Sequence, residues 1–275
     1  MNIGVMWRFV PDKIDGDLAM LSRLGFHSCH LAIPDPSLYD RLKPGEVSRL
    51  FEDQGMAIGA IWCGLGQPSR WDLVDGPKTV GFVPREYRRE RLDIIARCGE
   101  FSAAMGVADI ITHVGFIPED ETTALYDETS QVLGKVADSL AKYSCALLME
   151  TGQETPVSLL RTLEDLNRGN VGVNLDTGNL VMYGKGDPSG AIDTLGKNIL
   201  GVHAKDGRYP AGGREIGQET CCGDGVVRFA EVVSKLKKLG YAGDIMIERE
   251  IEGPQRVVDI VKARDLLRPI IDTEK

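Results

Sequence analysis

The chain has 275 residues, of which 43% are hydrophobic, 27% charged and 6% aromatic. This composition excludes disordered, collagen-like and coiled-coil proteins, and a chain of this length can bury a sizeable core without disulfides. Lysine and arginine number 32 against 41 acidic residues, a formal net charge of −9, which argues against a nucleic-acid partner because such partners favour a basic surface. No run of 18 apolar residues exists and the start lacks a signal-peptide pattern, so we expect a cytoplasmic protein without a membrane partner.

Short apolar runs alternate with longer amphipathic runs along the whole chain. The apolar runs mostly lack polar alternation, as expected of strands buried on both faces. They predict strands at 2–6, 26–33, 57–63, 107–114, 145–150, 171–176, 199–204 and 243–248. Between them, helical patterns lie near 15–24, 44–54, 85–105, 122–143, 156–166, 188–196, 226–239 and 254–269.

These eight strand–helix units, with no linker between them, predict one (β/α)8 TIM barrel as a single domain over 1–275. A doubly wound open sheet is the alternative, but it would normally carry a glycine-rich phosphate turn after its first strand, and WRFVPD at 7–12 is not one. Two long connections, 64–83 and 205–225, follow the third and seventh predicted strands. Barrels place their active-site loops at this end of the strands, so we expect both connections to border the site.

The fourth to eighth predicted strands end at or near polar residues, which are His113, Glu150, Asp176, His203 and Glu248. Strand ends converge at the mouth of a barrel, so the three carboxylates would repel one another unless a cation lay between them. Three oxygen ligands and one nitrogen ligand suit Mn²⁺, with Mg²⁺ or Co²⁺ as alternatives. The pattern therefore predicts a divalent-metal site.

Taken singly, each of the four candidate ligands has an ordinary structural alternative. Glu150 could cap a turn, Asp176 could form an Asx turn, and His203 could be a hydrogen-bonded core histidine. Glu248 could pair with Arg249 or with a neighbouring lysine. Their shared position at successive strand ends favours one common site over four unrelated roles.

Four segments carry a family resemblance: LLMETG, NLDTGN, GVHAKDG and IMIERE. They resemble the motifs of the sugar phosphate isomerase/epimerase family, which has a xylose isomerase-like TIM barrel and includes ketose 3-epimerases and inosose dehydratases. The resemblance covers the whole chain as architecture and is most specific over about 145–250. It implies that Glu150, Asp176, His203 and Glu248 are metal ligands, and that Glu150 and Glu248 also act as acid and base.

Two positions depart from that family pattern. Many ketose epimerases carry a histidine three residues after the strand-6 aspartate, and here this position is Asn179, which can bind a hydroxyl but does not titrate. In GDGVVRF, which is similar to the turn into the seventh helix, Arg228 stands where an acidic or amide residue is common. The departures leave the identity of the substrate open.

Further residues are expected to contact substrate: His113, Asn179, Lys205 and Trp62. His113 could instead be a core histidine, Lys205 a solvated loop lysine, and Trp62 a packing residue. Asp206 is expected to orient Lys205 or His203. The remaining polar candidates, His27, His30 and Arg8, are expected to have structural or loop roles.

The six cysteines fit a reducing compartment. Four lie singly in apolar stretches, and the adjacent pair Cys221–Cys222 has no zinc spacing, so we expect reduced, structural thiols with the pair at most a redox-sensitive spot.

This residue set predicts a metal-dependent ketose or ketose-phosphate epimerase or isomerase that removes a proton beside a carbonyl and passes through an enediolate. The same site could eliminate water, as in an inosose-type dehydratase. An endonuclease IV-like phosphodiesterase would need several more histidines than the four present, and a non-catalytic sugar-binding barrel would be expected to lose one of the two carboxylates. With no basic phosphate cradle visible, a free sugar or cyclitol is favoured, and homo-oligomerisation is left open.

Overall fold

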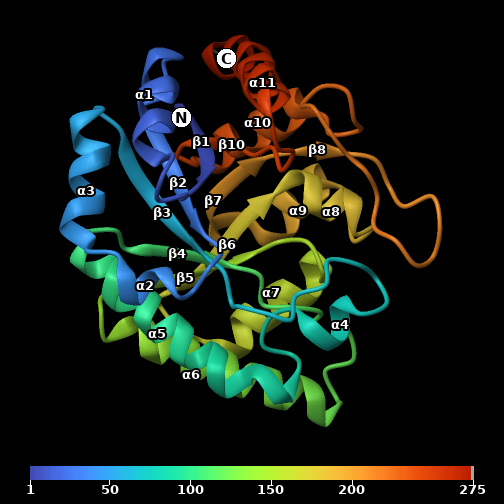
Figure 1. Ribbon diagram of the computed structural model, residues 1–275. Helices are drawn as coiled ribbons and strands as arrows, with labels where there is room; N and C mark the ends of the chain where they lie inside the picture. The colour runs from blue at the N-terminus through green and yellow to red at the C-terminus, as the bar shows by residue number, and fades with distance from the viewer. Residues whose placement is uncertain (274–275) are drawn as a thin grey trace.

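Eight parallel strands close into a barrel in the computed structural model, which describes residues 1–273 (Figure 1). The barrel strands are β1 (Ile3–Arg8), β2 (Ser28–Ile33), β3 (Ala57–Cys63), β4 (Asp109–Thr112), β5 (Ala146–Glu150), β6 (Val171–Asp176), β7 (Ile199–Ala204) and β10 (Ile245–Ile247). Each strand pairs with the next along the chain, and β10 pairs with β1 to close the ring. This topology confirms the predicted (β/α)8 barrel; the last two residues of the predicted domain, 274 and 275, lie outside the described residues.

Helices surround the barrel (Figure 1). The main ones are α1 (Ile14–Arg23), α3 (Pro44–Asp53), α5 (Arg88–Ala104), α6 (Ala124–Ala141), α7 (Pro156–Leu166), α9 (Pro188–Leu195), α10 (Phe229–Leu239) and α11 (Pro254–Asp272). Their boundaries follow local chemistry: α7 begins at a proline, the Thr155 side chain accepts from the Ser158 N–H, and Asn167 ends the helix in the left-handed conformation. The large apolar core lies between strands and helices.

The shorter elements lie in the connections. They are α2 (Leu38–Arg41), α4 (Gly76–Thr79), the 3₁₀ turns η1 (Arg85–Tyr87) and η2 (Gly196–Asn198), α8 (Thr177–Met182), and the small antiparallel pair β8 (Asp206–Gly207) and β9 (Glu219–Thr220). Among the described residues, no helix combines the length and apolar character needed to cross a membrane. All six cysteines are free and buried.

The interior of the barrel holds a small second apolar cluster of Ala60, Ile111 and Leu148, with Trp62 packed against it. Side chains alternate along a strand, so residues two positions further on face the same interior. Two positions beyond Ile111 and Leu148 come His113 and Glu150. The apolar cluster therefore forms the layer of the barrel interior next to the polar residues at the strand ends.

Two β-bulges change which side chains point into the barrel. Between β2 and β3 the register runs from Cys29–Ile58 to His30–Ala60, so Gly59 is an extra residue. Between β6 and β7 it runs from Val173–Ile199 to Asn174–Gly201, so Leu200 is extra, and its side chain is exposed. Such bulges re-aim neighbouring side chains and are common beside active sites.

The two long connections lie on the same side of the barrel (Figure 1). They also touch each other: the Leu73 N–H in the first donates to the Arg214 carbonyl oxygen in the second, at 3.3 Å. The first is anchored by the buried Arg91 of α5, whose guanidinium donates to the carbonyl oxygens of Gly81, Pro68 and Thr79. One arginine therefore holds three points of the 64–83 connection.

Replacing Arg91 by methionine is expected to lower the free energy of unfolding by about 3 kcal/mol, because three carbonyl groups lose a charged donor. Local opening should increase as well, so limited proteolysis should cut within 64–83 at least tenfold faster than in the wild type. Urea titration and mass spectrometry of the fragments measure the two effects. The exposed neighbour Arg89, replaced by methionine, is the matched control. Unchanged proteolysis in the Arg91→Met variant would contradict this anchoring.

Candidate metal centre and active site

Four predicted residues meet at the carboxyl ends of the strands. Glu150 ends β5, Asp176 ends β6, His203 lies in β7 and Glu248 follows β10 directly. All four are buried, and one candidate ligand atom from each lies within 4.8 Å of the others. The His203 Nδ1 atom lies 2.8 Å from Glu150 Oε1 and 2.9 Å from Glu248 Oε2.

Three atoms of this cluster are left without hydrogen-bond partners: His203 Nδ1, Asp176 Oδ2 and Glu248 Oε2. His203 Nδ1 is close to two carboxylates, yet neither contact has hydrogen-bond geometry. Buried polar atoms without partners are costly, and so is a cluster of buried carboxylates. A divalent cation bound by these atoms would give the unpartnered atoms a ligand and would neutralise the negative charge of the carboxylates. The donor set therefore fits a metal with oxygen and imidazole ligands.

The electrostatics of the cluster are those of a site that attracts positive charge. Burial raises the pKa of Asp176 well above its ordinary value; Lys205 opposes this rise, and Glu248 and Glu150 add to it. Burial would lower the pKa of His203, but the same two glutamates outweigh it and raise the pKa to about 10. Without a metal, the cluster therefore retains protons that a cation would displace.

Glu150 is held by a ring of donors. Its Oε2 accepts from Trp62 Nε1 at 2.5 Å and lies 3.1 Å from His113 Nε2, and its Oε1 accepts from Asn174 Nδ2 at 3.3 Å. Burial would raise the pKa of Glu150, but His113 and His203 outweigh it and lower the pKa. The carboxylate is thus oriented, and the two histidines favour its ionised form.

Asn174 was missed by the sequence reasoning, although a signal exists. It precedes Asp176 by two residues and so faces the same interior. Its side chain fits because Gly201 on β7 has no Cβ: a methyl group there would come within 2.5 Å of the Asn174 Oδ1 atom.

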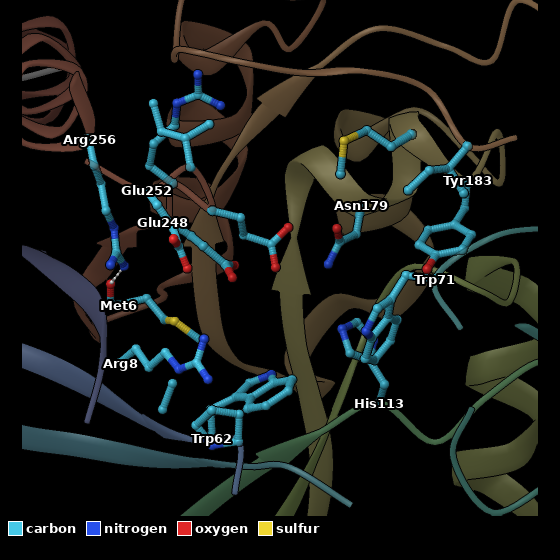
Figure 2. Close-up of a pocket in the computed structure, with 17 residues that line it drawn as sticks. Met6, Arg8, Trp62, Trp71, His113, Asn179, Tyr183, Glu248, Glu252 and Arg256 are labelled. Carbon is cyan, nitrogen blue, oxygen red and sulfur yellow. Dashed lines mark hydrogen bonds between the residues drawn. The ribbon is translucent and has the colours of Figure 1, made fainter. Parts of the chain in front are cut away.

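A cavity of about 370 Å³, a volume within the range of small-molecule sites, reaches the cluster at Glu248, which is the candidate ligand among its lining residues. Of the residues predicted to contact substrate, Trp62, His113 and Asn179 line it. Figure 2 shows Asn179 and His113 on one side of the cavity, together with Trp71 and Tyr183, and Glu248 on the other side, next to Glu252. Trp71 comes from the 64–83 connection, which therefore borders the site as expected.

The opposite wall carries Arg8 and Arg256, together with Met6 and Glu252 (Figure 2). The Arg256 guanidinium lies 3.9 Å from the centre of the Trp7 ring, and its Nη2 donates to the Met6 carbonyl oxygen. Arg256 belongs to α11 and was missed, because its place at the cavity depends on how that helix packs.

Lys205 does not line the cavity. Its side chain is buried, with Nζ 2.7 Å from Glu250 Oε2 and 3.8 Å from Glu248 Oε1. Burial would raise the pKa of Glu248, but Lys205 and His203 outweigh it and hold the pKa well below its ordinary value. Gly178 makes room for Lys205, since a Cβ there would lie 2.6 Å from its Cγ atom. The lysine therefore contacts an acid of the cluster and not the cavity.

Asp206 binds the backbone of the loop that follows β7. Its carboxylate accepts hydrogen bonds from the backbone N–H groups of Gly207, Gly223, Gly225 and Val227, at 2.8 to 3.0 Å. These contacts tie the two ends of the 205–225 connection together beside the cavity. Arg228, the departure noted in GDGVVRF, pairs at the surface with Glu231 and Asp187.

His30 lies beneath the cluster, on β2. It is buried, and its Nδ1 atom is 3.0 Å from Nε2 of His203. Burial lowers the pKa of His30 well below its ordinary value, and His203 adds to the effect. The other histidine expected to be structural, His27, is exposed.

Comparisons with known proteins agree with this architecture. A crystal structure of a xylose isomerase domain protein from Planctomyces limnophilus superposes with a TM-score of 0.89 at 28% identity, covering 98% of this chain and 96% of that one. An L-ribulose 3-epimerase structure gives a TM-score of 0.75 at 18% identity, covering 99% and 95%.

At the level of sequence, the uncharacterised protein MJ1311 of Methanocaldococcus jannaschii is 27% identical over 177 residues. The match covers 59% of this chain and 56% of that protein, so the chain spans little more than half of this relative's length. The family model described as xylose isomerase-like TIM barrel matches residues 18–270, nearly the whole chain. With the closed barrel and the motifs at its strand ends, this match confirms the predicted family: the chain belongs to the xylose isomerase-like TIM barrel family.

Proposed function

We propose that the protein is a divalent-metal-dependent sugar epimerase or isomerase that removes a proton from the carbon beside a carbonyl group. The observation that carries this proposal is the cluster of Glu150, Asp176, His203 and Glu248, with ligand atoms within 4.8 Å of one another, beside a cavity that Glu248 lines. The structural likeness to an L-ribulose 3-epimerase supports a ketose as the substrate. A cavity of about 370 Å³ can hold a sugar.

In this proposal the four clustered residues hold Mn²⁺, with Mg²⁺ or Co²⁺ as alternatives. When bound, the metal supplies Lewis-acid stabilisation for the negative charge that develops on the substrate oxygen. Glu150 and Glu248 flank the substrate and exchange protons with it: one, as a carboxylate, takes the proton as the C–H bond breaks, and the other, as a protonated carboxylic acid, delivers its proton to the opposite face. This transfer inverts one carbon centre and leaves the enzyme ready for the reverse reaction.

The surrounding residues have separate tasks in this mechanism. Trp62 and His113 contact Glu150 Oε2 and also line the cavity, so they orient the carboxylate and form one wall for the sugar. Asn179 faces the cavity and can bind a hydroxyl group. Lys205 Nζ lies 3.8 Å from Glu248 Oε1 and favours the ionised form of this acid. The loops that carry Trp71 and Ile216 limit access of water.

Incubation of the Mn²⁺-loaded protein with a panel of ketoses in D₂O tests the proposal. Deuterium at C3 with a new diastereomer, followed by NMR, is the expected result for an epimerase, and deuterium at C1 or C2 with an aldose is the result for an isomerase. Loss of water would instead assign the site to a dehydratase. Tight metal binding without exchange into any of these sugars, free or phosphorylated, would overturn the proposed chemistry.

A further inference from the structure

A hydrogen bond between two histidines lies directly under the metal-ligand cluster. The His30 and His203 rings are 5.2 Å apart between centroids and tilted by 55°, and 3.0 Å separates His30 Nδ1 from His203 Nε2. Both side chains are buried. We propose that His30 is a positioning residue that sets the tautomer and ring orientation of the metal ligand His203. This inference rests on the proposed function, because it concerns the metal that the cluster would hold.

The direction of the hydrogen bond follows from the other side of the His203 ring. Its Nδ1 atom faces Glu150 and Glu248, so this is the nitrogen available to a metal. A neutral imidazole that binds through Nδ1 carries its proton on Nε2. The Nε2–H group therefore donates to His30 Nδ1, and His30 must keep its own proton on Nε2.

Metal-binding histidines usually donate their second N–H to a carboxylate, a carbonyl oxygen or water. Here the acceptor is a neutral imidazole, which fixes the ligand ring without adding a fourth negative charge beside three carboxylates. An acidic residue at this position would increase the repulsion within the cluster. The neutral acceptor is therefore suited to the acid-rich composition of this site.

The backbone is shaped to hold the His30 ring in place. The extra residue in β3 stands between the partners of Cys29 and His30, and it is a glycine. A Cβ on Gly59 would lie 3.2 Å from both Cδ2 and Nε2 of His30, and 3.4 Å from the Met246 methyl group. The bulge and the missing side chain thus leave just enough space for the ring.

Isothermal titration of EDTA-treated protein with Mn²⁺ tests the inference without relying on turnover. The His30→Leu variant leaves His203 Nε2–H without an acceptor, so its Mn²⁺ affinity should fall 10- to 100-fold, the usual effect of removing such a contact. The His30→Asn variant can place its amide oxygen where Nδ1 stands, and its affinity should stay within about threefold of the wild type. His27→Leu, at the exposed histidine nearby, should bind as the wild type does.

A second readout is independent of the variants' stability. In the Zn²⁺-loaded wild type, long-range ¹H–¹⁵N spectra should show His203 bound through Nδ1 and both His203 and His30 protonated at Nε2. Unchanged Mn²⁺ affinity in folded His30→Leu, or His30 protonated at Nδ1, would overturn the role of His30. Absence of metal binding in the wild type would instead overturn the proposed function, so the two failures can be told apart.

Discussion

Replacing either Glu150 or Glu248 by glutamine is expected to lower kcat/KM for epimerisation about 1,000-fold. Each glutamine removes one acid–base group, and such groups contribute roughly 10²- to 10⁴-fold to the rate. Both acids are also candidate ligands, so metal content must be measured in each variant by atomic emission at saturating Mn²⁺. Steady-state assays with both epimers of the substrate then give the loss attributable to proton transfer.

The two variants should differ in which epimer they still exchange with D₂O. If one carboxylate serves each face of the sugar, Glu150→Gln should retain deuterium exchange for one epimer, and Glu248→Gln for the other, while interconversion of the epimers stays strongly reduced in both variants. Glu164→Gln, an exposed acid on α7, is the matched control and should keep full activity. Full activity in either site variant, or loss of exchange for the same epimer in both, would contradict the two-carboxylate mechanism.

The sequence could predict the barrel and the acid cluster because both depend on regular spacing. Buried parallel strands appear as apolar runs, and the last polar residue of a run lies at the mouth of the barrel. Counting back two residues from those strand ends would also have found Asn174, which contacts Glu150 Oε1. His30 lies in the middle of β2, a strand without acidic residues, so the sequence predicted only a structural role for it.

Asp176 shows why single-residue alternatives were hard to separate. Its Oδ1 atom accepts from the Asn179 N–H at 2.7 Å and caps α8, which is the local role expected of an aspartate at a turn. Its Oδ2 atom is buried, has no hydrogen-bond partner and belongs to the candidate metal cluster. The two interpretations describe different oxygens of one carboxylate, so a choice between them was not needed.

Residues of loops and outer helices were less predictable. Trp71 and Arg256 reach the cavity from the 64–83 connection and from α11, and no periodic pattern specifies either placement. Lys205 and Asp206 have the polarity of site residues, but their partners depend on loop paths: Glu250 for the lysine, and backbone N–H groups for the aspartate. Spacing along strands therefore predicts the site residues at the strand ends better than those contributed by loops and outer helices.

Addition of Mn²⁺ to EDTA-treated protein is expected to raise Tm by about 10 °C. A metal at 1,000 times its Kd stabilises the folded state by roughly 4 kcal/mol, and each kcal/mol corresponds to roughly 2–4 °C in a chain of this size. The gain should grow with pH. The pKa of His203 is raised from the ordinary value of 6.5 to about 10 in the folded, metal-free protein. Its proton therefore stabilises the metal-free protein fully below pH 6.5, and this contribution is lost as the pH rises towards 10.

The metal must displace this proton, so its apparent Kd should fall at least tenfold per pH unit between pH 6.5 and 8.5. Calorimetric titration in buffers of different ionisation enthalpy counts the protons released, and at least one per metal is expected. Asp176→Asn should lose most of the Mn²⁺-dependent rise in Tm, yet unfold no earlier than the wild type without metal, because burial and the neighbouring glutamates already disfavour its charge. The exposed Asp12, replaced by asparagine, is the control. A pH-independent Kd, or an undiminished rise in Asp176→Asn, would show that the cation does not bind at this cluster.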